Sequence, residues 1–189
     1  MAMAQRNAAR DRLIEIVRQR SFSKGQDVKL VSGRSSNFYF NMKPSMLDPE
    51  AGSLMAGLIL DALKGADVDL IGGLEMGAVP LAVAVAVTSQ IKGWPLRAFF
   101  VRKEVKDHGA RKLIEGLAAD ESLAGKRVVV LEDVTTTGAS ALRAIEAVRA
   151  DGAVVVCVIS VVDRQEGAER AFQAAGVPFT ALLQAADFL

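Results

Sequence analysis

Short apolar runs alternate along the chain with longer segments in which apolar residues recur every three or four positions. The runs at residues 68–71, 96–101, 128–131 and 154–162 have the length and composition of buried strands. Because they are apolar throughout rather than alternating, we expect a parallel sheet with helices on both faces. The pattern therefore predicts an α/β fold.

The segments between these runs carry helix signals. An opening helix has an apolar face around Leu13 and is expected to end shortly before Gly25. The sequence Asp48-Pro49-Glu50 predicts the start of a second helix, because it combines a capping side chain, a proline in the first turn and an acid near the positive end of the dipole. Three later helices are expected to end near residues 88, 150 and 175. Two short strands, 28–31 and 38–42, are expected between the first two helices.

Composition limits the classes of function. The 189 residues fit one domain, and a net charge of +1 gives no overall field that would attract nucleic acid or an anionic membrane. Cys157, the single cysteine, lies in an apolar run and is expected to be a buried, inert thiol. The longest apolar stretch, residues 77–87, is too short to cross a bilayer, and the first residues lack the apolar core of a secretory signal. We therefore expect a cytoplasmic protein with locally placed functional charge.

The most informative segment is residues 128–140, with the sequence VVVLEDVTTTGAS. An apolar strand ends in two adjacent carboxylates, and a turn with hydroxyls and a glycine then opens a helix. Carboxylates accept hydrogen bonds from vicinal sugar hydroxyls, and a turn at a helix N-terminus suits a phosphate. Taken singly, an acid after a strand and a capping threonine are common without any ligand. The segment has neither the Gly-Lys-Ser/Thr of the P-loop nor Gly-x-Gly-x-x-Gly, and as a whole it predicts a ribose 5-phosphate site.

This segment resembles the fingerprint with which type I phosphoribosyltransferases bind PRPP, the 1-diphosphate of ribose 5-phosphate. The resemblance implies that Glu132 and Asp133 bind the ribose hydroxyls, with a catalytic role for Asp133. The turn implied to bind the 5-phosphate consists of Val134, Thr135, Thr136, Thr137, Gly138, Ala139 and Ser140. The resemblance also implies the type I phosphoribosyltransferase fold in a single domain, 1–189. In that fold a small N-terminal hood, mainly 1–45, stands beside a core of parallel sheet and flanking helices, about 46–189.

Residues 102–112 bring the only histidine and five other basic residues into a segment without an apolar run. Cations that close over a departing pyrophosphate would stabilise the transition state. By itself the segment is equally typical of a solvated surface loop.

The motif Arg-Lys-Glu-x-Lys-Asp-His-Gly in this segment resembles the catalytic loop of the orotate phosphoribosyltransferases within that family. The resemblance implies a flexible loop, 102–118, that reaches into the active site of a neighbouring subunit, so that the enzyme is a homodimer. The residues implied to contact the diphosphate are Arg102, Lys103, Lys106 and His108, of which Lys106 and His108 are the catalytic candidates.

Two further segments resemble the base site of the same family. Residues 32–41 resemble the orotate-binding hood segment, which implies a role for Phe38 and Tyr39, and an aromatic ring beside N–H donors suits a flat anionic pyrimidine. Residues 161–167 resemble the segment with an orotate-contacting arginine, so Arg164 inherits that role and Thr136 is implied to touch the base as well. The alternatives are an ordinary hairpin with core aromatics and a surface salt bridge for Arg164.

Two positions depart from the family pattern. Val31 and Met76 stand where many members have lysines that contact PRPP, and Lys29 or Lys43 are possible substitutes for these lysines. These differences affect single contacts more than the implied activity.

The activity implied by the resemblance is the transfer of the 5-phosphoribosyl group from PRPP to orotate, in pyrimidine (UMP) biosynthesis. Mg²⁺ is the implied cofactor, held mainly through PRPP or pyrophosphate, with no dedicated protein site. The rival interpretations are a phosphoribosyltransferase for another base, a non-catalytic PRPP-binding regulator that binds nucleic acid, and a structural α/β module. The neutral net charge speaks against the regulator, and residues 128–140 speak against the structural module.

Overall fold

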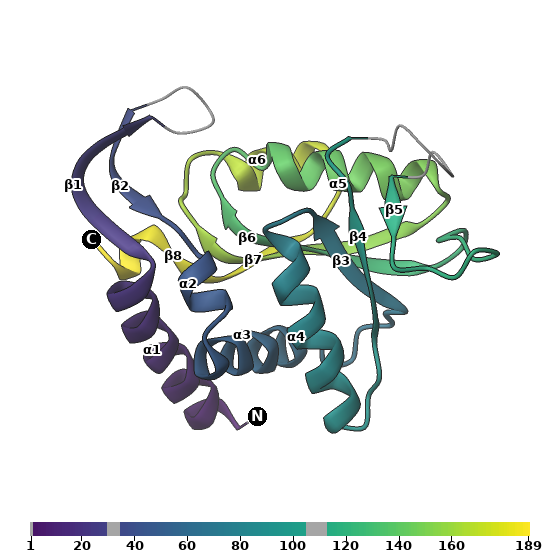
Figure 1. Ribbon diagram of the computed structural model, residues 1–189, viewed down its shortest axis with the longest axis horizontal. Helices are drawn as coiled ribbons and strands as arrows, with labels where there is room; N and C mark the ends of the chain where they lie inside the picture. Colours follow the sequence, from purple (N-terminus) through teal and green to yellow (C-terminus); the bar gives the residue numbers. More distant parts are fainter. Residues whose placement is uncertain (1, 30–34, 105–112) are drawn as a thin grey trace.

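A six-stranded sheet in the order β5-β4-β3-β6-β7-β8 forms the centre of the molecule (Figure 1). The computed structural model describes residues 2–29, 35–104 and 113–189. The strands of the central sheet are β3 (Leu70–Leu74), β4 (Arg97–Val101), β5 (Ile114–Glu115), β6 (Arg127–Thr135), β7 (Val154–Asp163) and β8 (Phe179–Gln184). Neighbouring strands are parallel from β4 to β8, and β5 alone is antiparallel to its neighbour. The predicted α/β fold with a largely parallel sheet is therefore confirmed.

Helices cover both faces of this sheet (Figure 1). The helices of one side are α1 (Met3–Arg20), α2 (Lys43–Met46), α3 (Pro49–Ala62) and α4 (Ala78–Ile91), and those of the other are α5 (Ala139–Ala150) and α6 (Ala168–Ala174). The side chains of β6 alternate between the two sides, because Val129 and Leu131 pack with α3 and α4 whereas Val128 and Val130 pack with α5. Burial on both faces explains why the strand is apolar throughout.

An antiparallel hairpin of β1 (Phe22–Lys29) and β2 (Ser35–Phe40) forms a separate sheet at one end of the molecule (Figure 1). Its apolar face is a cluster of phenylalanine rings. The ring centroids of Phe22 and Phe40 lie 5.1 Å apart, and Phe188 lies 5.5 Å from Phe22 and 5.0 Å from Phe40. The hairpin is thus held by a residue that follows the last strand of the central sheet.

The predicted start of α3 is confirmed in atomic detail. One carboxylate oxygen of Asp48 accepts hydrogen bonds from the N–H groups of Glu50 and Ala51, both at 3.0 Å, and Pro49 is the first helical residue. The expectation for Gly25 is wrong. Helix α1 already ends at Arg20, and Gly25 lies within β1 with φ 90°, where the register with β2 shifts. The glycine permits a bulge in a strand rather than the end of a helix.

Four elements were not expected from the sequence: α2, β5, β8 and the 3-10 helix η1 (Ala185–Asp187). Strand β5 is only two residues long and interrupts a polar segment, so it carries no periodic signal. None of the helices in the described part of the chain has the length and hydrophobicity needed to span a membrane.

Candidate active site

The order of the strands marks one place in the sheet where a ligand site is expected. Strands β3 and β6 are neighbours, but the chain leaves β3 toward β4 and leaves β6 toward β7, on opposite sides. The segments that follow two such strands diverge, and they leave a crevice at the carboxyl ends. The turn 75–77 follows β3, and the turn 136–138 follows β6. The crevice thus lies beside the segment that the sequence analysis singled out.

Glu132 and Asp133 stand near the end of β6, with their carboxyl groups close enough to interact. Glu132 is only 6% exposed, and in the described part of the chain its Oε2 atom has no hydrogen-bond partner. Burial raises the pKa of Glu132 well above its usual value, and the negative charge of Asp133 raises it further. A buried acceptor without a donor is costly to the fold, and it is chemically prepared for a donor from a ligand.

Asp133 faces the turn after β3. Its Oδ1 atom accepts a hydrogen bond of 2.9 Å from the N–H of Val134, and a Cβ atom at Gly77 would lie only 2.6 Å from the same oxygen. Any residue other than glycine at position 77 would collide with this carboxylate. The sequence analysis did not identify Gly77 as a site residue, although a glycine between a strand and a helix is a usable signal.

The turn after β6 brings the backbone into the N-terminus of α5. Gly138 has φ 84°, in the left-handed region, and a Cβ atom there would lie 3.0 Å from the ring of Phe172. Thr137, Ala139 and Ser140 are exposed. Exposed hydroxyls and free N–H groups at a helix N-terminus form an arrangement that suits an anion.

Thr135 is the member of this segment whose side chain points away from the turn. It is 1% exposed, and its hydroxyl has no hydrogen-bond partner in the described part of the chain. Strand β6 continues through Thr135, so alternation along the strand directs the side chain into the protein. The side chain therefore does not join the exposed hydroxyls of the turn.

Arg164 and Phe38 are 126 positions apart in sequence but in direct contact. The guanidinium carbon of Arg164 lies 4.2 Å from the centre of the Phe38 ring, and Nη1 donates a long hydrogen bond of 3.4 Å to the Phe38 carbonyl. The backbone N–H of Arg164 donates to the carbonyl of Thr135 at 2.9 Å. The hairpin, the end of β7 and the turn after β6 therefore meet at Arg164.

Tyr39 is exposed and lies between Phe38 and Phe40 on β2, so its side chain faces the other side of the hairpin. The structure brings together Arg164 and Phe38, but it does not bring Tyr39 to them. Thr136, partly exposed, directly follows the carbonyl that Arg164 contacts.

The basic segment leaves the sheet next to the crevice. The N–H of Arg102 donates to the carbonyl of Leu113 at 2.8 Å, which closes the two ends of the segment on each other. Glu75 accepts a hydrogen bond of 2.9 Å from the N–H of Lys103 through its side chain, and its own N–H donates to Val101 at 2.8 Å. Lys103 thus lies beside the turn after β3, whereas the guanidinium of Arg102 donates to the carbonyl of Glu104 at 3.2 Å and lies 3.9 Å from Glu115 of β5. Lys106 and His108 lie outside the described residues, as does Val31.

Two further positions named from the sequence are Lys43 and Met76. Lys43 begins α2 and is exposed, and Met76 is an exposed residue of the turn 75–77. Glu75 contacts Lys103, and Glu166 contacts Arg164. Neither glutamate was predicted as a site residue, because these contacts become visible only in the folded structure.

The comparisons with known proteins agree with this geometry. A model of the phosphoribosyl transferase domain matches residues 45–175. The orotate phosphoribosyltransferase of Bradyrhizobium sp. strain BTAi1 is 59% identical over 184 residues, which are 97% of this chain and 99% of the relative. That of Sorangium cellulosum is 46% identical, over 95% of this chain and 93% of the relative.

Solved structures give the same result. The crystal structure of the Mycobacterium tuberculosis H37Rv orotate phosphoribosyltransferase in complex with PRPP is 37% identical with a TM-score of 0.77, covering 95% of this chain and 98% of that one. The adenine phosphoribosyltransferase of Leishmania donovani, at 18% identity and a TM-score of 0.66, shares the fold. The chain therefore belongs to the phosphoribosyltransferase family of enzymes, and within that family it belongs with the orotate phosphoribosyltransferases.

Proposed function

We propose that this protein transfers the 5-phosphoribosyl group from PRPP to orotate and releases orotidine 5-monophosphate and pyrophosphate, as a step of pyrimidine biosynthesis. The observation that carries the proposal is 59% identity to an orotate phosphoribosyltransferase over 97% of the chain. The crevice at the carboxyl ends of β3 and β6 is the place proposed for this reaction. In this reaction N1 of orotate forms a bond to C1 of the ribose, and the bond from C1 to the diphosphate oxygen breaks.

The sugar-phosphate half of the site consists of the end of β6 and the start of α5. Glu132 and Asp133 accept hydrogen bonds from the two ribose hydroxyls, and the orphaned Oε2 of Glu132 supports this assignment. The segment from Thr136 to Ser140, in which Thr137, Ala139 and Ser140 are exposed, surrounds the 5-phosphate with N–H groups and hydroxyls. Each hydrogen bond to a charged oxygen contributes about 1.5–3 kcal/mol. Four or five of them hold the phosphate while the bond at C1 changes.

The base half consists of Arg164, Phe38 and Thr136. The guanidinium of Arg164 contacts the carbonyl of Phe38, and a planar fork of donors suits the carboxylate of orotate. The contact of Arg164 with the Phe38 ring supports a role for both residues in the same site. A role for Tyr39 remains a prediction from the sequence.

The basic segment supplies the positive charge for the diphosphate. Lys103 stands next to the turn after β3, and this position supports its proposed contact with PRPP. The contact of Arg102 with PRPP is proposed from the resemblance of the sequence motif. Lys106 and His108 are the proposed catalytic residues, which stabilise the negative charge that collects on pyrophosphate as it leaves. Closure of this loop over the site would also exclude water.

Mg²⁺ is the proposed cofactor. The described residues contain no group of three or more His, Cys, Asp or Glu side chains that could hold a metal ion by themselves. The carboxylates of Glu132 and Asp133 are hard oxygen ligands, and they fit a magnesium ion that arrives with the diphosphate and sugar hydroxyls. When bound, the ion neutralises charge on the diphosphate.

We also propose that the enzyme is a homodimer whose loop 102–118 is shared between subunits. The described part of the chain supports self-association through α4, whose residues Val83, Val87 and Ile91 form one exposed stripe and are 56%, 57% and 81% exposed. Helix α4 contains no charged residue, so two copies of it can approach without like-charge repulsion.

Val87→Glu is expected to produce monomers and to lower activity, because a charge in an apolar interface loses its hydration. Sedimentation velocity measures the state of assembly. Gln173→Glu adds the same charge to α6 on the opposite side of the sheet and serves as the control. A wild-type protein that sediments as a monomer at assay concentrations would contradict the dimer.

The activity is tested by following the ultraviolet absorbance of orotate in the presence of PRPP and Mg²⁺. We expect a loss of orotate that depends on all three components and on the enzyme. Turnover of uracil or a purine in place of orotate would favour the rival specificity. PRPP binding without turnover of any base, together with binding in a polynucleotide titration, would favour the regulator. The cytoplasmic location stays a prediction from the sequence.

A further inference from the structure

The chain makes a left-handed turn where it leaves β7. Gln165 has φ 60°, and it is the one non-glycine residue in the described ranges with a positive φ. Side chains with a Cβ atom disfavour this conformation, and it persists where the surrounding structure imposes it. Here the carboxylate of Asp163 imposes it, because Oδ1 accepts a hydrogen bond of 2.9 Å from the N–H of Gln165.

This turn brings Glu166 back onto Arg164, two positions earlier. The Oε1 atom of Glu166 accepts from Nε of Arg164 at 2.8 Å and also lies 2.8 Å from Nη2. The side chain of Arg164 is 2% exposed and that of Glu166 is 23% exposed, so the arginine is buried while the glutamate still reaches water. A buried cation needs a counter-charge, and loss of that charge is costly.

Glu166 occupies one edge of the guanidinium, and the opposite end is directed elsewhere. Nε and Nη2 face Glu166, whereas Nη1 is directed at the carbonyl of Phe38 with a contact of 3.4 Å. The ring of Phe38 covers the flat face of the guanidinium at 4.2 Å. Glu166 thus restrains one edge of the guanidinium, and Phe38 restrains its flat face.

We propose that Glu166 is a positioning residue that orients Arg164 for recognition of the carboxylate on the base. This inference rests on the proposed function, in which Arg164 contacts orotate. A donor group that is already oriented loses less conformational freedom when the ligand binds, so affinity for that ligand rises. The strained turn at Gln165 and the acceptor of Asp163 are the structural means by which Glu166 reaches its position.

The test compares steady-state constants of Glu166→Ala, Glu166→Gln and the wild-type enzyme. Glu166→Ala is expected to raise KM for orotate about tenfold, which corresponds to about 1.4 kcal/mol, while KM for PRPP stays within about twofold of wild type. Glu166→Gln keeps an acceptor oxygen without the charge, so it should give a smaller rise. The separation of the two KM values is the readout that general damage to the fold would not produce.

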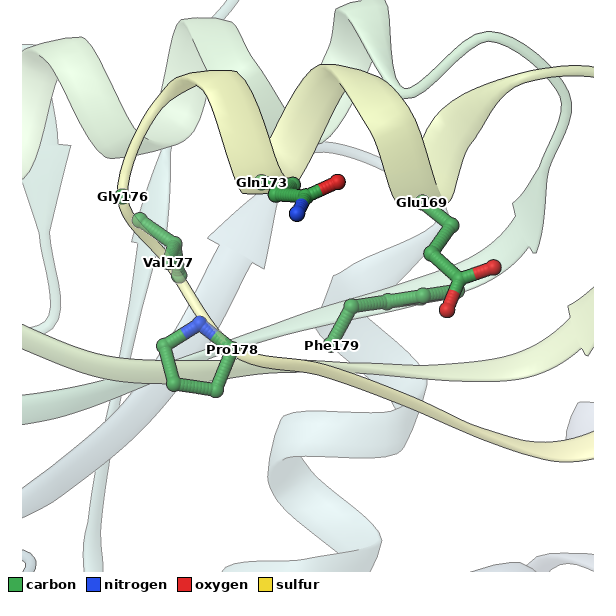
Figure 2. Close-up of a pocket in the computed structure, with 6 residues that line it drawn as sticks. All are labelled: Glu169, Gln173, Gly176, Val177, Pro178 and Phe179. Atoms are coloured by element: carbon green, nitrogen blue, oxygen red, sulfur yellow. The ribbon is translucent and has the colours of Figure 1, made fainter.

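Glu169→Gln is the matched control. Glu169 has the same chemistry three positions later, but it lines an open hollow of about 440 Å³ between α6 and β8, together with Phe179 (Figure 2). Its removal changes net charge by the same amount and should leave both KM values near wild type.

Each possible result either supports or contradicts the positioning role of Glu166. An unchanged or lower KM for orotate in Glu166→Ala overturns the positioning role, as does an equal rise in both KM values. If Glu166→Ala fails to fold, the result for Glu166→Gln decides, because it preserves the shape of the side chain. A wild-type enzyme that does not turn over orotate contradicts the proposed function itself, independently of the variants.

Discussion

The two halves of the site differ in how their polar groups are satisfied before any ligand binds. In the sugar-phosphate half, Glu132 is buried with an acceptor oxygen that has no partner in the described chain. In the base half, Arg164 is buried equally well, but Glu166 and Phe38 already contact it. The sugar-phosphate half thus contains an acceptor that a ligand can satisfy, whereas in the base half the protein itself already holds Arg164 in place.

The difference has an energetic meaning. An unsatisfied buried polar group costs the fold about 1–3 kcal/mol, and a ligand that supplies the missing donor recovers that amount. A satisfied ion pair contributes little additional energy on binding, but it limits which ligands fit. We therefore expect the first half to supply affinity and the second half to supply selectivity between bases.

The largest expected effect follows from Asp133→Asn. The amide removes one negative charge from the ribose site, and loss of hydrogen bonds to a charged acceptor should weaken PRPP binding about ten- to hundredfold. Isothermal titration calorimetry with Mg²⁺ present measures it. Asp151→Asn, which changes an acid at the end of α5, is the control. If Asp133→Asn binds PRPP with wild-type affinity, the assignment of Asp133 to the sugar site is wrong.

Arg164→Lys should produce the next largest effect, confined to the base half. An ammonium keeps the charge but cannot contact Glu166 through two nitrogens or cover the Phe38 ring, so KM for orotate should rise about tenfold. The melting temperature should fall by about 2–4 °C for each kcal/mol lost. KM for PRPP should hardly change. A rise in KM for PRPP as large as that for orotate would show that the two halves are not separate.

Glu132→Gln should raise stability and weaken binding at the same time. Because burial raises the pKa of Glu132, the folded state holds this proton more tightly than the unfolded state does. The stability from this group is fully present below its ordinary pKa of 4.5 and is lost as pH rises through the folded pKa.

At pH 7 the neutral amide should therefore melt at a higher temperature than wild type, and the gain should shrink as pH falls toward 4.5. Thermal melts at several pH values, combined with PRPP titrations, measure both effects. A variant that is less stable than wild type at neutral pH would contradict the account of Glu132 as an unsatisfied acid.

Thr135→Val is expected to have the smallest effect. Valine has nearly the same shape and removes a buried hydroxyl that has no partner in the described chain, so stability should rise by about 1 kcal/mol. The change in KM for PRPP should be smaller than that of Thr137→Val, whose side chain is exposed on the turn. If Thr135→Val loses more PRPP binding than Thr137→Val, the Thr135 hydroxyl does contact the phosphate.

Local signals made much of this structure predictable. The cap at Asp48 and the apolar run before Glu132 are local signals, and they correctly predicted a helix and a strand at these places. Strand β6 (Arg127–Thr135) is nevertheless longer than the predicted strand 128–131. The start of the turn was placed too early, because alternation continues through Thr135 and buries its side chain. The end of β6 depends on how far this strand pairs with β7, and local sequence signals do not predict that extent.

Long-range contacts could not be predicted in the same way. Resemblance pointed to Arg164 and to both Phe38 and Tyr39, but only the fold distinguishes the two aromatic residues by the face of β2 on which each lies. The left-handed conformation of Gln165 has no signal in the sequence, because glutamine does not favour it. The contact of Glu166 with Arg164 depends on that conformation and was missed with it.

The ring of Phe188 against the hairpin has a consequence for the order of folding. A two-stranded hairpin is marginally stable by itself, and β1 and β2 gain their apolar cover from a residue almost 150 positions later in the chain than Phe40. Contacts between such distant segments form late, because a long loop must close first. During refolding, binding of the sugar phosphate should therefore recover earlier than the ability to select one nucleobase over another.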